Sequence, residues 1–252
     1  MIAFNTTFDR GDQVTRGELR GVVALDGPSG TGKSTVAKRL AVALRARYLD
    51  TGAMYRAVTL AVLDAGIDPA DSAAVADLTP ALDLVIGTDP AAPAVHLAGA
   101  DIATDIRAQR ITTSVSAIAG VPEVRKILIN AQQKIIADAL NAGGGIVVEG
   151  RDIGSVVAPD AGLKVYLDAS PEARAKRRTR QDTAAGRMTT VDATRADVDR
   201  RDGIDARTTP LRPAPDAVEL DTTNLDVNGV IAALLSMVDD RSMRDVPERT
   251  GP

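Results

Sequence analysis

The sequence has no cysteine, no tryptophan and a single histidine, and aromatic residues make up 2% of it. Without cysteine the chain can form no disulfide framework, no thiolate metal site and no cysteine nucleophile. The shortage of aromatic rings leaves few surfaces on which the bases of a single strand can stack, and the net charge of −4 is unlike the basic surface of a general nucleic-acid-binding protein. We therefore expect no nucleic-acid partner, and an anionic ligand has to be bound by a local cluster of arginines.

The chain also lacks a long hydrophobic run. No apolar stretch approaches the ~20 residues that a membrane-spanning helix needs, and the N-terminal residues lack the apolar segment of a signal peptide. Hydrophobic residues still make up 44% of the 252 positions, enough for a core of Ala, Val, Leu and Ile. These features predict a cytoplasmic enzyme without a membrane partner. Residues 1–20 and 239–252 are polar and aperiodic, which predicts flexible ends around one domain at residues 21–238.

The most informative stretch is the run Gly-Pro-Ser-Gly-Thr-Gly-Lys-Ser at residues 27–34, which matches the P-loop pattern G-x-x-x-x-G-K-[ST] at every fixed position. A short apolar run at 22–25 predicts a strand before it, and helical spacing at 35–45 predicts a helix after it. In this context backbone N–H groups converge on phosphate, Lys33 reaches the β- and γ-phosphates, and the Ser34 hydroxyl binds Mg²⁺. We predict that a nucleoside triphosphate is bound by Gly27, Pro28, Ser29, Gly30, Thr31, Gly32, Lys33, Ser34 and Thr35.

Strands and helices are expected to alternate along the rest of the chain. Further strands are predicted at residues 48–49, 145–149, 163–167 and 217–220, and further helices at 53–65, 71–82, 108–119, 122–141, 171–184, 192–202 and 227–238. This order predicts an α/β fold with a parallel sheet covered on both faces, whose ligands bind at the carboxyl ends of the strands. Short strand-like pieces at 84–86, 94–97 and 102 predict an inserted antiparallel meander, on which His96 is a packing or surface residue.

Arginines and acids lie near the predicted strand ends. Arg56, Arg151, Arg201 and Arg207 suit a second substrate that carries a phosphate, because guanidinium groups bind phosphate oxygens bidentately. The helix at 171–184 has three arginines on one face, and this face forms either a lid over the phosphates or a solvated charged surface: Arg174, Arg177 and Arg178. Three acids at strand ends either hold Mg²⁺ through water or cap loops: Asp26, Glu149 and Asp168.

Four ordered segments resemble the bacterial cytidylate kinases. They are Asp-Gly-Pro-Ser-Gly-Thr-Gly-Lys-Ser at 26–34, Asp-Thr-Gly-Ala-Met-Tyr-Arg at 50–56, Glu-Gly-Arg-Asp-Ile-Gly at 149–154 with Val-Val-Ala-Pro-Asp-Ala at 156–161, and Arg-Asp…Asp…Arg at 201–207. The resemblance runs from about residue 21 to 238. It implies a P-loop nucleoside-monophosphate kinase fold with a five-stranded parallel sheet, a monophosphate-binding lobe at about 53–142 that contains the meander, and a short lid at about 174–196. The implied reaction is phosphorylation of CMP and dCMP by ATP with Mg²⁺.

The resemblance also implies roles for single residues. Those around the acceptor phosphate would be Thr51, Tyr55, Arg56, Arg151 and Arg207. Those that read the cytosine edge would be Ser116, Arg125 and Asp152, and those on the ribose hydroxyls would be Arg201 and Asp205. Those that stabilise the charge of the transferred phosphoryl group would be Lys33, Arg151 and Arg178. The chain departs from the family in the short spacing from Asp205 to Pro210, which leaves the register of Arg207 open.

Two alternatives stay open at this stage. One is a P-loop kinase for another monophosphate, UMP or dTMP, although such an enzyme gives no reason for a carboxylate facing a base amino group. The other is a nucleotide-dependent switch without transferase activity; a GTPase is disfavoured because the base-reading Asn-Lys-x-Asp segment is missing. The few aromatic residues and the lack of an apolar surface stripe predict a monomer.

Overall fold

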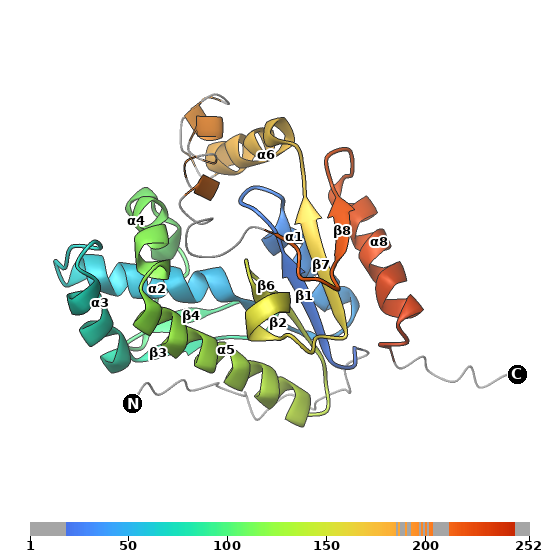
Figure 1. Ribbon diagram of the computed structural model, residues 1–252, viewed down its shortest axis with the longest axis horizontal. Helices are drawn as coiled ribbons and strands as arrows, with labels where there is room; N and C mark the ends of the chain where they lie inside the picture. The colour runs from blue at the N-terminus through green and yellow to red at the C-terminus, as the bar shows by residue number, and fades with distance from the viewer. Residues whose placement is uncertain are drawn as a thin grey trace, which may run out of the picture.

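The computed structural model describes residues 19–184 and 212–244 and, between them, residues 186, 190, 193–196, 198, 200, 202 and 203. Five parallel strands form the main sheet in the order β2-β6-β1-β7-β8, and they run side by side through the middle of the molecule (Figure 1). Their bounds are β1 Val22–Asp26, β2 Arg47–Asp50, β6 Ile146–Glu149, β7 Leu163–Asp168 and β8 Val218–Asp221. The predicted five-stranded parallel sheet is confirmed.

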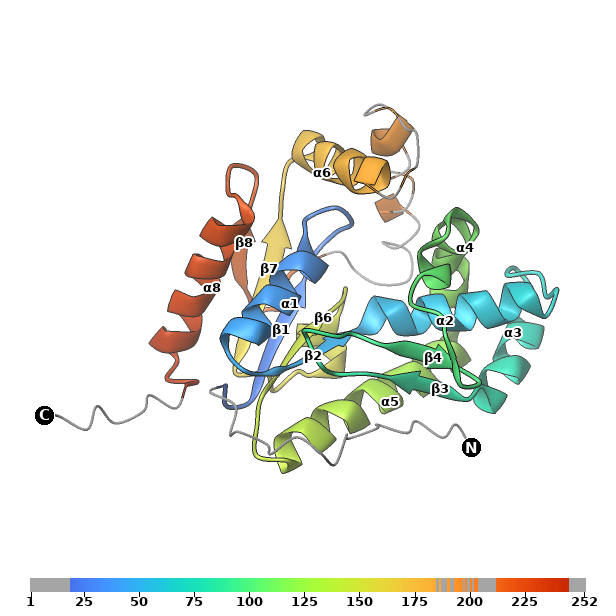
Figure 2. The same cartoon turned by 180° about the vertical axis from the view of Figure 1, so that it is seen from behind.

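The central strand β1 is buried along its whole length because both of its faces are covered. Val23 and Leu25 face a cluster with α1 (Lys33–Ala43) and α8 (Val227–Asp240), whereas Val22 and Ala24 face a cluster with α2 (Thr51–Asp64) and α5 (Pro122–Asn141). The alternation follows from the period of two along a strand. Figure 2 shows α1 and α8 on one side of the sheet, and Figure 1 shows α5 on the other.

A lobe beside the main sheet contains the inserted meander. Its antiparallel sheet has the order β3-β4-β5, with β3 at Leu84–Ile86, β4 at Val95–Leu97 and β5 at Ala100–Asp101. The third strand therefore ends just before the predicted position, Ile102, whose side chain is buried in the core of the lobe. The helical elements of the lobe are α3 Ser72–Leu78, the 3₁₀ turns η1 Thr79–Ala81 and η2 Asp105–Arg107, and α4 Gln109–Ala119.

Three segments differ from the simple alternating pattern. Helix α6 (Pro171–Ala184) lies across the carboxyl ends of the strands, above the glycine loop (Figure 1). A single π-helical turn, η3 at Ile153–Val157, follows β6 and was not predicted. Leu19 and Met243 are buried against the sheet end, and Leu19 pairs with Arg244, so residues just outside the predicted domain boundaries pack onto the domain.

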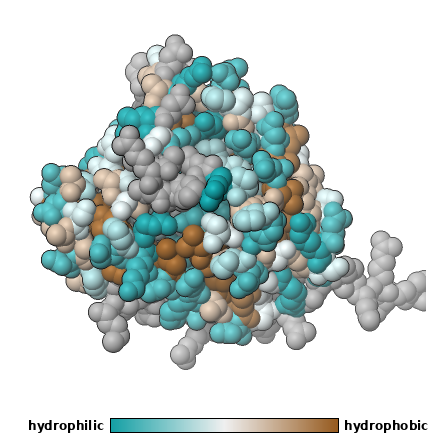
Figure 3. Space-filling view, viewed as in Figure 1, coloured by the Kyte–Doolittle hydropathy of each residue, from teal (hydrophilic) through white to brown (hydrophobic). Residues whose placement is uncertain are grey.

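Hydrophilic side chains cover most of the face shown in Figure 3, and hydrophobic residues form small groups between them. The large hydrophobic side chains that are exposed are scattered over different elements: Val42, Leu140, Val156 and Leu225. Within the described part of the chain, no helix is both long enough and apolar enough to cross a membrane.

Candidate active site

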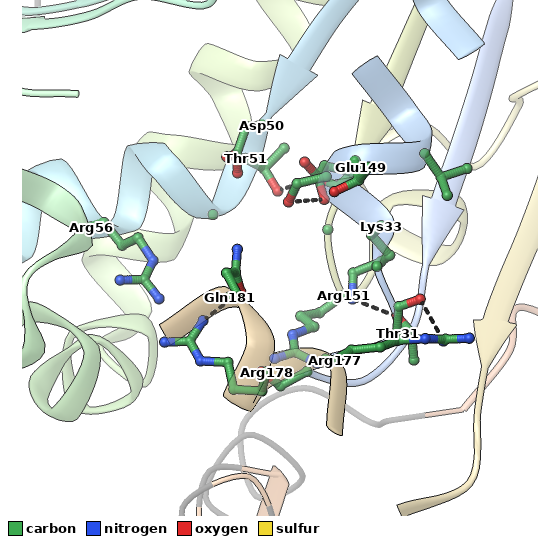
Figure 4. Close-up of a pocket in the computed structure, with 18 of the residues that line it drawn as sticks. Thr31, Lys33, Asp50, Thr51, Arg56, Glu149, Arg151, Arg177, Arg178 and Gln181 are labelled. Carbon is green, nitrogen blue, oxygen red and sulfur yellow. Dashed lines mark hydrogen bonds between the residues drawn. The ribbon is translucent and has the colours of Figure 1, made fainter. Parts of the chain in front are cut away.

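A cavity of about 560 Å³ opens where the parallel strands end, between the main sheet, the lobe and α6 (Figure 4). Residues from several distant segments line it, as expected for the carboxyl edge of a parallel sheet. These segments are the glycine loop, the ends of β2 and β6, helices α2, α4, α5 and α6, and the start of α8.

The glycine loop has a backbone that only glycine adopts without strain. Gly27, Gly30 and Gly32 have φ angles of 145°, 83° and 93°. A Cβ atom on Gly27 would also lie 2.1 Å from the carbonyl oxygen of Leu167 on β7. Gly32 is the N-cap of α1, so the unpaired N–H groups of the first helical turn face the cavity entrance, where they favour an anion.

Lys33 lies inside this loop. Its ammonium group donates hydrogen bonds to the carbonyl oxygens of Gly27 and Pro28, both at 2.7 Å. Burial lowers the pKa of Lys33, and the nearby positive charge of Arg151 lowers it further. Arg151 donates to the same Gly27 carbonyl at 3.0 Å, so the two cations that the sequence predicts for phosphate binding lie beside one another.

The carboxylate of Glu149 at the end of β6 accepts two side-chain hydrogen bonds. The Ser34 hydroxyl donates to Oε2 at 2.9 Å, and the Tyr48 hydroxyl donates to Oε1. Burial raises the pKa of Glu149, and the charge of Asp50 raises it further. Asp50 itself accepts from the Ala53 backbone N–H at 2.9 Å, which caps α2.

The oxygen atoms of Ser34, Glu149 and Asp50 are a suitable donor set for Mg²⁺. This ion prefers hard oxygen ligands, and it is usually held by one or two carboxylates together with substrate phosphates and water. Among the described residues, no group of three or more His, Cys, Asp or Glu side chains is arranged to hold a metal alone. The residues present therefore fit a cation that arrives with the triphosphate.

The two other strand-end acids cap loops. Both carboxylate oxygens of Asp26 accept backbone N–H groups of Ile153 and Gly154 at 2.8 Å, which fixes the π-helical turn. Asp168 is exposed and accepts from the Ala169 N–H at 2.8 Å. Of the two interpretations left open for these acids, loop capping applies to Asp26 and Asp168.

Six predicted acceptor-site residues line the cavity on the side of the lobe: Thr51, Tyr55, Arg56, Ser116, Arg125 and Asp152. Arg125 on α5 pairs with Asp152 at 2.5 Å, and the buried Ser116 faces the same cavity from α4. Burial raises the pKa of Tyr55 to about 12, so this hydroxyl stays protonated. A hydroxyl, a guanidinium and a carboxylate are thus brought together by three separate segments.

Thr51 and Arg56 also make hydrogen bonds within the protein. The Thr51 hydroxyl donates to the Glu149 carbonyl oxygen at 2.7 Å, which joins the ends of β2 and β6. One nitrogen of Arg56 donates to the Ile106 carbonyl and the Thr112 hydroxyl, both at 3.0 Å, which ties α2 to η2 and α4. Arg56, Arg151 and Arg178 nevertheless reach into the space beside the glycine loop (Figure 4).

The three arginines of α6 have different contacts. Arg174 donates to the Ser29 carbonyl at 3.1 Å, and Arg177 donates to the Thr31 carbonyl at 3.2 Å, so both hold the helix against the glycine loop. Arg178 lines the cavity, donates to Gln181 at 3.1 Å and pairs with Asp182 at 3.4 Å. Arg174 and Arg177 of the predicted common face therefore fix the loop, whereas Arg178 pairs within its own helix; Arg177 and Arg178 both line the cavity.

Three predicted residues lie outside the described residues: Arg201, Asp205 and Arg207. Their described neighbour Asp202 accepts a hydrogen bond from the Ser29 backbone N–H at 3.3 Å and pairs with Arg174. This contact brings residue 202, the last residue of the helix predicted at 192–202, to the glycine loop.

Some residues around the cavity have no signal in the sequence. Arg107, whose side chain is half exposed, lines the cavity and pairs with Asp50 at 2.7 Å. The sequence predicts only a strand at Tyr48, whereas its hydroxyl donates a hydrogen bond to Glu149. Neither residue belongs to a sequence motif, and their partners are 57 and 101 residues away, so no local signal pointed to them. The start of α8 also contributes to the lining, with Leu225, Asp226, Val227 and Val230.

A parallel five-stranded sheet with the glycine loop after its central strand, and with cationic side chains around the adjoining cavity, defines a P-loop kinase. The model of the family "Cytidylate kinase" matches residues 23–240. The chain belongs to the cytidylate kinase family, as its motifs predict.

Curated relatives agree with this membership. A cytidylate kinase of Rhodococcus opacus is 53% identical over 223 residues, which are 88% of this chain and 96% of the relative. A cytidylate kinase of Corynebacterium glutamicum is 51% identical over 225 residues, again 88% of this chain and 96% of the relative. Among solved structures, a sugar kinase from Janibacter aligns with a TM-score of 0.48 at 14% identity, over 90% of this chain and 99% of that one. That last likeness is too weak to support an argument.

Proposed function

We propose that the chain transfers the γ-phosphate of ATP to CMP and dCMP, which yields CDP and dCDP. The observation that carries the proposal is a single cavity that extends from the glycine loop to the Arg125–Asp152 pair. The relatives named as cytidylate kinases, at about 50% identity over most of the chain, support the same acceptor.

The donor ATP binds with its phosphates on residues 27–35. The backbone N–H groups at the start of α1 contact the phosphates, and Lys33 exchanges the carbonyl oxygens of Gly27 and Pro28 for phosphate oxygens. Ser34 holds Mg²⁺, with Glu149 and Asp50 as the adjacent carboxylates. When bound, this cation neutralises charge on the phosphates.

The acceptor phosphate binds between Arg56 and Arg151, with Tyr55 beside them. Thr51 is the first residue of α2, and its hydroxyl donates its proton to the Glu149 carbonyl oxygen, so this hydroxyl can serve the phosphate only by giving up that hydrogen bond. Arg207 belongs to the same group by the family pattern.

The cytosine ring binds at Ser116, Arg125 and Asp152. Cytosine presents acceptors at O2 and N3 and a donor at its amino group, which a guanidinium and a carboxylate complement. Uracil would place a carbonyl oxygen where the amino group lies, against Asp152, and is therefore disfavoured. By the family pattern, Arg201 and Asp205 bind the ribose hydroxyls.

No protein nucleophile is needed. A phosphate oxygen of CMP attacks the γ-phosphorus in line, and the bond from that phosphorus to the β,γ-bridging oxygen breaks, so ADP leaves. Lys33, Arg151 and Arg178 stabilise the charge of the phosphoryl group during transfer. The monomeric state and the cytoplasmic location stay predictions.

The test is ADP formation from MgATP with CMP, dCMP, UMP, dTMP or no acceptor. We expect ADP to form at a rate that depends on added CMP or dCMP, with kcat/KM for UMP about a hundredfold lower because of the unpaired carboxylate. An ADP rate that does not respond to any monophosphate would indicate a nucleotide-dependent switch. Equal kcat/KM for CMP and UMP would refute the cytosine assignment.

A further inference from the structure

Three polar side chains form a connected series from the core to the cavity: Tyr48 on β2, Glu149 on β6 and Ser34 on α1. The Tyr48 hydroxyl donates to Oε1 of Glu149, and the Ser34 hydroxyl donates to Oε2 at 2.9 Å. Tyr48 and Glu149 are 2% and 4% exposed. Ser34 and Glu149 line the cavity, whereas Tyr48 is not among its described lining residues.

The two hydroxyls together fix the plane of the Glu149 carboxylate. A carboxylate held by a donor on each oxygen cannot rotate about its last side-chain bond without losing both hydrogen bonds. A buried carboxylate oxygen without a donor is unfavourable, and Asp50 adds a second negative charge nearby. Removing the phenolic hydroxyl therefore frees the carboxylate to turn, and Ser34 loses its fixed acceptor.

A tyrosine at this position suits a site that binds a cation. The phenol donates a hydrogen bond without adding a positive charge, so Glu149 keeps its negative charge available to a divalent ion. The ring itself packs in the cluster with Leu40 of α1 and Leu44, the residue that follows this helix, which holds the hydroxyl in place. The same β2 strand also supplies Asp50 at its end, two residues further along.

We propose that Tyr48 is a positioning residue for the divalent cation that accompanies the nucleotide, acting through Glu149 on the Ser34 hydroxyl. This inference rests on the proposed function, because it takes the triphosphate and its cation to lie at the glycine loop. It predicts a specific defect in the Tyr48→Phe variant. Without Mg²⁺ the variant binds the nucleotide as tightly as the wild type does, but Mg²⁺ raises its affinity for the nucleotide by a smaller factor.

The experiment measures the Kd of the β,γ-imido analogue of ATP by calorimetry, with Mg²⁺ and with EDTA. The Mg²⁺ gain is the Kd in EDTA divided by the Kd with Mg²⁺. We expect this gain to be about tenfold smaller in Tyr48→Phe than in the wild type, because removing a hydrogen-bond partner of a metal-binding group weakens metal binding by that order. The Kd in EDTA and the KM for CMP should stay at their wild-type values. Tyr166→Phe is the matched control, because Tyr166 is 6% exposed on β7 and is not among the described cavity residues.

A double-mutant cycle with Glu149→Gln tests the route of the effect. If Tyr48 acts through Glu149, then Tyr48→Phe should change the Mg²⁺ gain little once Glu149 is replaced. The proposal is wrong if Tyr48→Phe keeps the wild-type Mg²⁺ gain in nucleotide affinity, or if its affinity for the analogue falls by the same factor in EDTA as with Mg²⁺. It is also wrong if Tyr48→Phe lowers the Mg²⁺ gain as much in the Glu149→Gln background as in the wild type. A wild-type protein without any Mg²⁺ gain would overturn the inference and the proposed cation site together, while acceptor-dependent ADP formation tests the transferase function separately.

Discussion

Replacement of Lys33 by methionine is expected to lower kcat for CMP phosphorylation by about a thousandfold or more. Methionine keeps the length of the side chain but removes the only ammonium group inside the glycine loop, which lies beside Arg151 and contacts the Gly27 and Pro28 carbonyls. On the proposed mechanism, the ammonium charge of Lys33 stabilises the phosphoryl group mainly during its transfer. The measurement is the initial rate of ADP formation at saturating ATP and CMP.

Lys38→Met is the matched control for this variant. Lys38 lies on the same helix, α1, but outside the described lining of the main cavity. We expect it to retain wild-type kcat. A Lys33→Met protein that melts like the wild type and keeps more than a tenth of its kcat would show that the ammonium group does not stabilise the transferred phosphate.

Replacement of Asp152 by alanine is expected to lower kcat/KM for CMP by roughly a thousandfold and to remove most of the preference for CMP over UMP. The carboxylate pairs with Arg125 at 2.5 Å, so its loss removes the acceptor for the cytosine amino group and also leaves Arg125 without this partner. The Kd of ATP should change little, because Asp152 lies on the lobe side of the cavity. Steady-state kinetics with both monophosphates give the preference directly.

Asp160→Ala serves as the control, since Asp160 is exposed on the segment that follows the same strand. It should keep both the rate and the preference. The base-edge assignment would be contradicted if Asp152→Ala lost its affinity for ATP while the ratio of CMP to UMP turnover stayed as in the wild type.

The elements around the glycine loop could be predicted because their signals are local. The P-loop motif specifies the chemistry of each position, and the glycine φ angles show why a side chain is excluded from Gly27. The helices and strands are predicted from their periodicity, and observed bounds such as Pro122–Asn141 and Ile146–Glu149 lie within two residues of the predictions. The helix predicted at 71–82 is shorter, because α3 ends at Leu78 and a 3₁₀ turn follows, and the helix predicted at 192–202 lies partly outside the described residues.

Features that depend on side-chain direction across distant segments could not be predicted. The three arginines of α6 share one helical face, yet packing against the glycine loop turns Arg174 and Arg177 toward backbone carbonyls. The π-helical turn after β6 depends on the carboxylate of Asp26, which is 127 residues from Ile153. The spacing of apolar residues within one helix or strand contains no information on contacts between distant segments.

We propose that one cavity holds the donor on the glycine loop and CMP beside it on the lobe side. A crystal structure with the β,γ-imido analogue of ATP, Mg²⁺ and CMP tests it most directly. We expect the analogue phosphates on residues 27–35, the CMP phosphate at Arg56 and Arg151, and the cytosine at Arg125 and Asp152. A CMP molecule bound outside this cavity, or a complex in which saturating CMP leaves these side chains without a ligand, would contradict it.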